Sequence, residues 1–261
     1  MKPVRAKKKL GQHFLTDLTI ARRIAETLDF QKYSNIIEIG PGMGVLTQFL
    51  VSETQSLNLV EIDSESIAYL KNTCDENQVN LIEGDFLKLD FKNTFGEEPF
   101  AIIGNFPYNI STQIVFKTLE NRDQIPFFSG MFQKEVAERI CEPPGSKKYG
   151  ILSVLTQLFY KTELLFHVPP QVFKPPPKVD SAVIRLVRKT DFHLDCDEVL
   201  LFQLVKLSFQ QRRKTLRNSL KTLNIPKMLT EDSIFDQRPE KLSGKDFVQL
   251  AKQIGHGNIS N

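Results

Sequence analysis

The feature that most constrains the fold is a short apolar run that ends at a polar, proline-containing turn and is followed by a segment of helical periodicity. Residues 100–103 have the length and composition of a buried strand, residues 104–109 (GNFPYN) form the turn, and a helix is predicted from Ser111 onward. The runs at 36–39 and 57–62 are followed by turns and helical segments in the same way. This alternation predicts an α/β fold with an open sheet, in which ligands bind at the carboxyl ends of the strands.

The turn at 104–109 contains groups suited to holding a nucleobase. The side-chain oxygen of Asn105 is a neutral acceptor for an exocyclic amine. Pro107 stiffens the turn, and the backbone carbonyl of Phe106 beside it can accept the second hydrogen of that amine. The ring of Tyr108 can stack on a base. An ordinary strand-to-helix turn with a packed tyrosine is the alternative for a motif of this length.

A glycine-rich turn, residues 40–44 (GPGMG), follows the first of these strands. Glycines such as Gly40 and Gly42 let the backbone approach a ligand closely. Their spacing does not match the Gly-x-Gly-x-x-Gly pattern of dinucleotide sites. The acid inside the preceding strand, Glu38, points instead to a nucleoside without a pyrophosphate, and S-adenosylmethionine is such a ligand.

Acidic residues follow or end the next two predicted strands. Glu61 lies about twenty residues beyond the glycines, where doubly wound folds place an acid on ribose hydroxyls, and Ile62 follows it. Asp85 comes after the strand at 79–82 and can accept a hydrogen bond from the adenine amine of a cofactor, with Phe86 packed beside that base. A solvent-facing Asp85 and a core Phe86 are the alternatives.

Positive charge gathers at two places in a chain whose net charge is only +3. Five basic residues lie within the first nine positions, namely Lys2, Arg5, Lys7, Lys8 and Lys9. In the second group helical spacing would form a stripe of Arg213, Arg217 and Lys221, with Lys214 beside it. Each group is either a solvated surface or a contact for a phosphate backbone. A nucleobase site in the same chain favours the second alternative.

Five prolines within residues 169–177 exclude a helix or a central strand there. Phe173 and Lys174 lie inside this segment and have little backbone freedom. One alternative is a rigid surface connection with Phe173 folded inward. The other is a fixed ring that faces Tyr108, so that a base is held between the two rings.

The remaining composition limits the class of protein. No run approaches the roughly 18 apolar residues of a membrane span, and the basic N-terminus lacks the apolar region of a secretory signal. The three cysteines are far apart, which excludes a disulfide framework and a cysteine-rich zinc site and fits a reducing compartment. We therefore expect a cytoplasmic protein that uses no metal.

Taken together, these motifs resemble those of the ribosomal RNA adenine dimethyltransferase family, in particular its bacterial small-subunit branch. The matching segments are residues 11–15 (GQHFL), 38–42 (EIGPG), 61–63 (EID), 84–85 (GD), 104–111 (GNFPYNIS), 172–175 (VFKP) and 179–182 (VDSA). Each is a modest signal alone, but their order and spacing are specific. One departure is Phe106, where many members have Leu or Pro. Since the expected role there belongs to the backbone carbonyl, a different side chain does not alter it.

The resemblance implies a class I S-adenosylmethionine-dependent methyltransferase fold, which is a Rossmann-like seven-stranded sheet with the last strand antiparallel. It also implies a small all-α C-terminal domain. We expect a catalytic domain with a basic arm at residues 1–190 and a helical RNA-binding domain at 191–261. The cofactor contacts implied by the resemblance are His13, Leu15, Gly40, Glu61, Asp85 and Asn105, and the motifs add Gly42, Ile62 and Phe86.

The implied reaction moves methyl groups from S-adenosylmethionine to N6 of two adjacent adenosines near the 3′ end of 16S rRNA, in the 30S subunit or its precursor. Contacts to the target adenine are expected from Asn105, Phe106, Pro107, Tyr108 and Phe173. RNA contacts are expected from Lys7, Lys8, Lys9, Lys174, Arg212, Arg213, Lys214 and Arg217. We expect a monomer that takes part in ribosome biogenesis. The alternatives are a methyltransferase that modifies one adenine of large-subunit RNA, a DNA adenine methyltransferase, and an assembly factor that acts by binding.

Overall fold

The computed structural model describes residues 4–33, 35–54 and 56–259, so Lys2 of the basic N-terminus lies outside the described residues. The chain divides into two compact units. The first is made of Met1–Ala137 and Lys161–Arg188, and the second of Glu138–Tyr160 and Lys189–Asn261. This division differs from the predicted boundary near residue 190, because residues 138–160 group with the C-terminal part of the chain.

The grouping of residues 138–160 follows from the helix α7 (Ile151–Phe159). Most of its side chains are buried, so it needs apolar partners on several sides. It finds them in α8 (Glu198–Gln210) and α11 (Gly244–Ile259), which also pack against each other. A helix that is apolar around most of its circumference belongs to the interior of a bundle.

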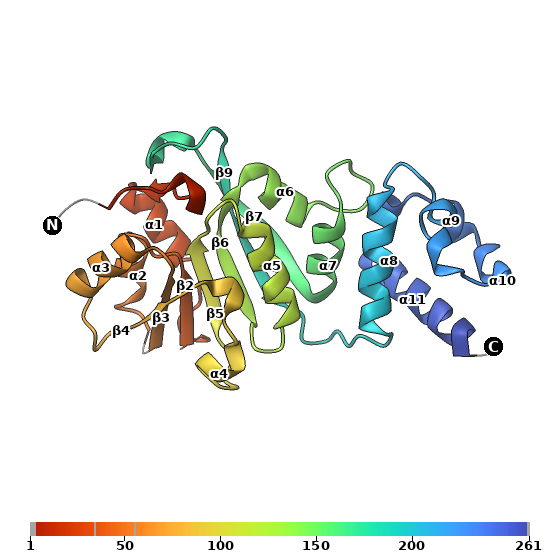
Figure 1. Ribbon diagram of the computed structural model, residues 1–261, viewed down its shortest axis with the longest axis horizontal. Helices are drawn as coiled ribbons and strands as arrows, with labels where there is room; N and C mark the ends of the chain where they lie inside the picture. Colours follow the sequence, from red (N-terminus) through yellow and green to blue (C-terminus); the bar gives the residue numbers. More distant parts are fainter. Residues whose placement is uncertain (1–3, 34, 55, 260–261) are drawn as a thin grey trace. The chain divides into compact units, whose positions relative to one another are not determined.

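A seven-stranded sheet runs through the first unit in the order β4-β3-β2-β5-β6-β9-β7 (Figure 1). The strands are β2 (Asn35–Ile39), β3 (Ser56–Glu61), β4 (Val79–Glu83), β5 (Ala101–Asn105), β6 (Phe127–Gln133), β7 (Tyr160–Val168) and β9 (Ser181–Arg188). Strands β2 to β6 pair in parallel, and β9 pairs antiparallel with β6. The predicted α/β fold of a class I methyltransferase is therefore confirmed. Strand β9 lies between β6 and β7, so the last strand along the chain is not at the edge.

Helices precede, connect and follow the parallel strands: α1 (Leu18–Ala25), α2 (Thr47–Leu50), α3 (Ser64–Thr73), α4 (Phe91–Phe95), α5 (Ser111–Glu120) and α6 (Lys134–Cys141). The carboxylates of Asp17 and Asp63 accept hydrogen bonds from backbone N–H groups in the first turns of α1 and α3, which would otherwise have no partner. Two short strands, β1 (Phe14–Leu15) and β8 (Phe173–Lys174), pair antiparallel with each other.

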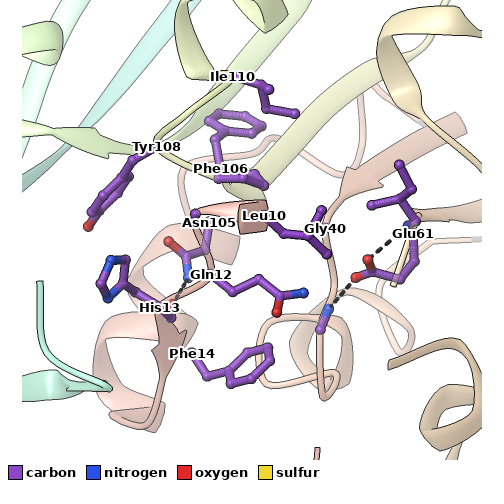
Figure 2. Close-up of a pocket in the computed structure, with 14 residues that line it drawn as sticks. Leu10, Gln12, His13, Phe14, Gly40, Glu61, Asn105, Phe106, Tyr108 and Ile110 are labelled. Atoms are coloured by element: carbon purple, nitrogen blue, oxygen red, sulfur yellow. Dashed lines mark hydrogen bonds between the residues drawn. The ribbon is translucent and has the colours of Figure 1, made fainter. Parts of the chain in front are cut away.

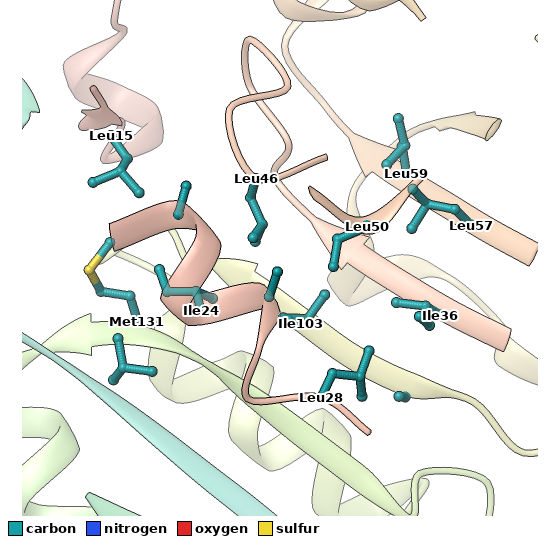
Figure 3. Packing of buried hydrophobic residues seen from close by; sticks show 14 of the residues in the cluster. Leu15, Ile24, Leu28, Ile36, Leu46, Leu50, Leu57, Leu59, Ile103 and Met131 are labelled. Carbon is teal, nitrogen blue, oxygen red and sulfur yellow. The ribbon is translucent and has the colours of Figure 1, made fainter. Parts of the chain in front are cut away.

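The core of the first unit lies where α1 and α2 pack on the sheet (Figure 3). Ile24, Leu50, Ile103 and Met131 come from four different elements and are all fully buried. Burying an apolar side chain of this size contributes about 1.5–3 kcal/mol. This packing fixes the strands whose carboxyl ends carry the motifs.

In the second unit the predicted basic helix is not formed. Helix α8 ends at Gln210, residues 211–215 form a turn, and the short helix α9 (Leu216–Ser219) begins after Thr215. Thr215 has extended backbone angles, φ −70° and ψ 160°, which interrupt the helix. Arg213, Arg217 and Lys221 therefore do not share a helical stripe, and the prediction based on their spacing was wrong. The remaining elements are α10 (Lys227–Thr230) and the 3₁₀ turns η4 (Lys221–Leu223), η5 (Ser233–Asp236) and η6 (Pro239–Lys241).

Candidate functional site

A pocket opens at the carboxyl ends of β2, β3 and β5, where the N-terminal segment crosses them (Figure 2). Its lining is Leu10, Gly11, Gln12, His13, Phe14, Gly40, Gly42, Glu61, Ile62, Asn105, Phe106, Pro107, Tyr108 and Ile110. The sequence motifs after three separate strands therefore meet in one place. This is the position at which open α/β sheets bind ligands.

The amide of Asn105 has a defined orientation. Its Nδ2 donates a hydrogen bond of 3.1 Å to the backbone carbonyl of His13 (Figure 2). Because a carbonyl oxygen can only accept, the NH₂ group must face His13 and the Oδ1 oxygen must face the other way. Among the described residues no donor is bonded to that oxygen, so Asn105 presents a free neutral acceptor.

Phe106 contributes its backbone to the pocket, because its side chain is buried beneath the turn. The ring stacks on Phe128 with centroids 4.9 Å apart and also contacts Phe132. Gly104 and Gly130 make room for it, since a Cβ on either residue would lie within 3 Å of the ring. The Phe106 N–H donates to the Met131 carbonyl, while its own carbonyl accepts no hydrogen bond within the described part of the chain.

Tyr108 is held at two points. Its hydroxyl shares a hydrogen bond of 2.5 Å with the hydroxyl of Ser181, and one face of its ring stacks on His13 with centroids 5.3 Å apart. The Nδ1–H of His13 in turn donates to the carbonyl of Pro175. Burial raises the pKa of Tyr108, so its phenol stays protonated at neutral pH.

The glycine turn after β2 has left-handed backbone angles at Gly40 (φ 65°) and Gly42 (φ 58°). A Cβ on Gly42 would lie 2.9 Å from the ring of Phe14, and one on Gly40 would touch Pro107. Side chains at these two positions would therefore be strained and would fill the floor of the pocket. The turn leaves backbone groups accessible to a ligand.

Glu61 closes the turn between β3 and α3. One carboxylate oxygen accepts from the backbone N–H groups of Ile62 and Asp63, and the other accepts from Gly42 at 3.1 Å (Figure 2). Burial raises the pKa of this carboxyl, although the three backbone donors favour its charged form. The remaining lone pairs are available to hydroxyl donors of a ligand.

Glu38, the acid inside β2, does not line the pocket. It is buried, and Oε2 accepts a hydrogen bond of 2.7 Å from the hydroxyl of Thr47 at the start of α2. This bond ties the strand before the glycine turn to the helix after it. Burial raises the pKa of Glu38 to about 8, with the nearby Glu61 adding to the shift.

The raised pKa of Glu38 predicts a pH-dependent stability. Between its ordinary value of 4.5 and about 8, the folded chain keeps a proton that the unfolded chain releases. The free energy of unfolding should therefore fall as the pH rises through this window, by at most about 1.4 kcal/mol per pH unit from this group. Glu38→Gln should remove that contribution. Urea unfolding from pH 5 to 8 measures it, with exposed Glu26→Gln as control, and equal slopes for wild type and Glu38→Gln would contradict it.

The N-terminal segment is fixed over the pocket by contacts that the motifs do not reveal. Lys7 pairs with Asp63 and, at 3.2 Å, with Glu65, and Gln12 Nε2 donates to Asp63. Gly11 adopts a left-handed conformation (φ 63°) close to the side chain of Asn109. Gln12 lies in a motif that the sequence does show, but its partner is 51 residues away. Periodicity gives no signal for such a pair.

Four expected site residues lie outside the pocket lining. Leu15 and Phe173 are paired across the β1–β8 ladder and buried in the core. Phe173 is only 3% exposed, so the structure does not bring it opposite Tyr108, and the inward-folded alternative describes its position. Asp85 caps the 3₁₀ turn η2 (Phe86–Lys88), where its carboxylate accepts from the Leu87 N–H, and Phe86 is buried against Phe91.

The basic residues expected to bind RNA fall into two classes. Those that are exposed are Lys8, Lys9, Lys174, Arg213 and Lys214. The other three make contacts within the chain: Lys7 with Asp63 and Glu65, Arg212 with the Ser146 carbonyl, and Arg217 with Asp236 and the Thr230 carbonyl. Only the first class leaves its charge open to a partner.

The described residues hold neither a metal-binding cluster nor a membrane-spanning helix. Within 4–33, 35–54 and 56–259 there is no group of three His, Cys, Asp or Glu side chains arranged to hold a metal ion. In the same part of the chain no helix combines the length and the apolar character of a membrane span.

Comparison with known proteins connects this geometry to a family. Residues 4–254 match the family model described as ribosomal RNA adenine dimethylase. A protein of Flavobacterium johnsoniae named ribosomal RNA small subunit methyltransferase A is 58% identical over 254 residues, which is 97% of each chain. One of the same name from Bacteroides thetaiotaomicron is 54% identical over 257 residues, covering 97% of this chain and 96% of the relative.

Solved structures give the same picture. A dimethyladenosine transferase from Plasmodium falciparum superimposes with a TM-score of 0.80 at 27% identity, covering 94% of this chain and 98% of that one. The 23S rRNA methyltransferase ErmE gives a TM-score of 0.68 at 25% identity, over 92% and 100%. The order of the strands, the pocket at their carboxyl ends and these matches all indicate the same family. The chain belongs to the ribosomal RNA adenine dimethylase family and has the fold of an S-adenosylmethionine-dependent methyltransferase.

Proposed function

We propose that this protein transfers methyl groups from S-adenosylmethionine to N6 of two adjacent adenosines near the 3′ end of 16S rRNA, in the 30S subunit or its precursor. It would act in the cytoplasm, as a monomer, during ribosome biogenesis. The names of the relatives support the substrate. The observation that carries the chemistry is the pair of free acceptors at the end of β5, the Asn105 Oδ1 and the Phe106 carbonyl.

These two acceptors would compensate for the low nucleophilicity of the adenine amine. The lone pair of the adenine amine is delocalised into the ring, which makes the amine a poor nucleophile. Before the first transfer, Asn105 and the Phe106 carbonyl each accept one of its hydrogens and so turn the lone pair out of conjugation with the ring. The monomethylated amine has one hydrogen left, so before the second transfer only one of the two acceptors is used, and each transfer releases one N6 proton to solvent. Pro107 keeps the two acceptors in place, and Tyr108 stacks on the adenine. The bound cofactor supplies an electrophilic methyl group on a sulfonium. Catalysis is then mainly positioning and electrostatics.

The pocket fits a nucleoside cofactor. Gly40 and Gly42 expose backbone where a Cβ would intrude, and Glu61 accepts from the ribose hydroxyls with its remaining lone pairs. Ile62, 52% exposed beside the pocket, offers an apolar surface to the base. His13 lines the same pocket. We extend this proposal to the cofactor contacts expected of Leu15, Asp85 and Phe86, which lie outside the pocket lining.

The test uses purified protein, radiolabelled S-adenosylmethionine, and small subunits from a strain that lacks this modification, with large subunits in parallel. Label recovered as N6,N6-dimethyladenosine near the 3′ end of 16S rRNA is the expected result. Label confined to large-subunit RNA would replace the proposal with the activity named for the ErmE structure. Tight small-subunit binding without label would favour an assembly factor.

We further propose that the exposed lysines of the first unit, Lys8, Lys9 and Lys174, contact RNA phosphates, and Arg213 and Lys214 do so from the second unit. Removing Lys8 and Lys9 together should weaken small-subunit binding and make the negative slope of log K against log salt shallower by about 1.4–1.8. Filter binding between 50 and 200 mM salt measures this. Lys32→Ala, an exposed lysine paired with Asp29, is the matched control. An unchanged slope for the double variant would show that both lysines are merely solvated.

A further inference from the structure

Ser181 is a buried serine whose role the reaction scheme leaves open. It belongs to residues 179–182, one of the motifs that carry the family resemblance, and it is the first residue of β9. Its side chain is fully buried. Its hydroxyl bonds to the hydroxyl of Tyr108, 73 residues earlier in the chain, at 2.5 Å.

The backbone around Ser181 is rigidly held. Ser181 pairs with Gln133 at the end of β6, and the next bond of the ladder runs from the Lys134 N–H to the Asp180 carbonyl at 2.9 Å. Strand β6 is itself paired in parallel with β5, the strand that carries Asn105. Ser181 and Asn105 therefore sit on the same framework, so the hydroxyl of Ser181 is a fixed point for the ring of Tyr108.

A second buried serine in the same pair of strands shows what a structural role looks like. Ser129 in β6 donates to the carbonyl of Ile184 and accepts from the hydroxyl of Thr27, and none of these groups lines the pocket. Ser181 differs because its hydroxyl is bonded to a pocket residue. We propose that Ser181 is a positioning residue for methyl transfer, which holds the Tyr108 ring at the angle at which the target adenine stacks.

The arrangement of the other rings makes this tether necessary. A base that is held between two rings would be oriented by both, but Phe173 lies in the core. One face of Tyr108 is covered by His13, so an adenine must use the opposite face or displace the His13 ring. In either case the stacking angle depends on Tyr108 alone, and the ring is fixed at its tip by Ser181.

The inference rests on the proposed role of Tyr108 and is tested by a double-mutant cycle on small-subunit methylation. Ser181→Ala and Tyr108→Phe should each lower kcat/KM by about 3- to 10-fold, the range expected for one neutral hydrogen bond. The double variant should be no worse than either single variant. Cofactor affinity, measured separately by calorimetry, should not change. Ser129→Ala is the matched control and should leave kcat/KM unchanged even where it lowers the melting temperature.

The possible outcomes separate this inference from the proposed function. If Tyr108→Ala methylates normally, the proposed stacking of Tyr108 on the adenine is refuted. If that variant loses activity, the stacking role is upheld. If the effects of Ser181→Ala and Tyr108→Phe multiply in the double variant, Ser181 acts through something other than the Tyr108 hydroxyl and the inference is overturned. A loss in Ser129→Ala equal to that in Ser181→Ala would overturn it as well.

Discussion

Replacing Asn105 with alanine should lower the turnover number by about 10²–10³, with a much smaller effect on cofactor affinity. The size of the loss is that found when one preorganised hydrogen-bonding group is removed from a site of developing charge. The expectation rests on the bond from Nδ2 to the His13 carbonyl, which points the oxygen of Asn105 away from the N-terminal segment. The measurement is single-turnover methylation of small subunits, together with calorimetry of cofactor binding.

Asn109→Ala is the matched control for this experiment. Asn109 is an exposed amide in the same turn, and its Nδ2 donates to the carbonyl of Lys9. Its removal should change turnover only a few-fold, since this amide is bonded to Lys9 and is not one of the two acceptors proposed to hold the adenine amine. An Asn105→Ala enzyme with nearly normal turnover would refute the role given to the free oxygen. Equal losses in both variants would show that the turn, rather than the acceptor, is what matters.

The parts of this structure that could be predicted from sequence are those with a local cause. Apolar runs followed by glycine, acid or amide give the strands, and the parallel sheet places their ends side by side. Gly40, Glu61 and Asn105 therefore meet in one pocket as expected. The inward packing of the Phe106 ring against Phe128 was not predicted, but it leaves the backbone carbonyl for the role proposed for it.

The parts that could not be predicted depend on contacts between distant segments. Phe173 was expected to face Tyr108, but its pairing with Leu15 across the β1–β8 ladder turns it into the core. Nothing in the sequence of the proline-rich segment predicts that it pairs with residues 14–15. Similarly, the basic stripe assumed an unbroken helix, and the extended backbone of Thr215 breaks it. Ser181 lies in a recognised segment, but only the structure shows which side chain its hydroxyl contacts.

Glu61→Ala should weaken cofactor binding by about 10²- to 10⁴-fold, which corresponds to two hydrogen bonds from ribose hydroxyls to a charged acceptor at about 1.5–3 kcal/mol each. The carboxylate is buried and already accepts three backbone N–H groups, so its position is fixed before the ligand arrives. That preorganisation is the reason we expect so large a loss of affinity from one side chain. Calorimetry with S-adenosylhomocysteine, the demethylated product, measures the loss without turnover.

Loss of the turn is the competing explanation for Glu61→Ala, because that variant leaves the N–H groups of Gly42, Ile62 and Asp63 without their acceptor. Glu61→Gln helps to separate the two explanations, since it keeps the volume and one acceptor oxygen but removes the negative charge. Its amide nitrogen cannot accept a hydrogen bond, so with the oxygen kept toward Ile62 and Asp63 only the Gly42 N–H loses its acceptor, and the melting temperature should fall less than in Glu61→Ala. A loss of affinity as large as that of Glu61→Ala, together with this smaller fall in melting temperature, would assign the effect to ligand contact. Exposed Glu76→Gln is the matched control, and a loss of affinity there equal to that of Glu61→Gln would mean that general charge, not the fixed carboxylate, holds the cofactor.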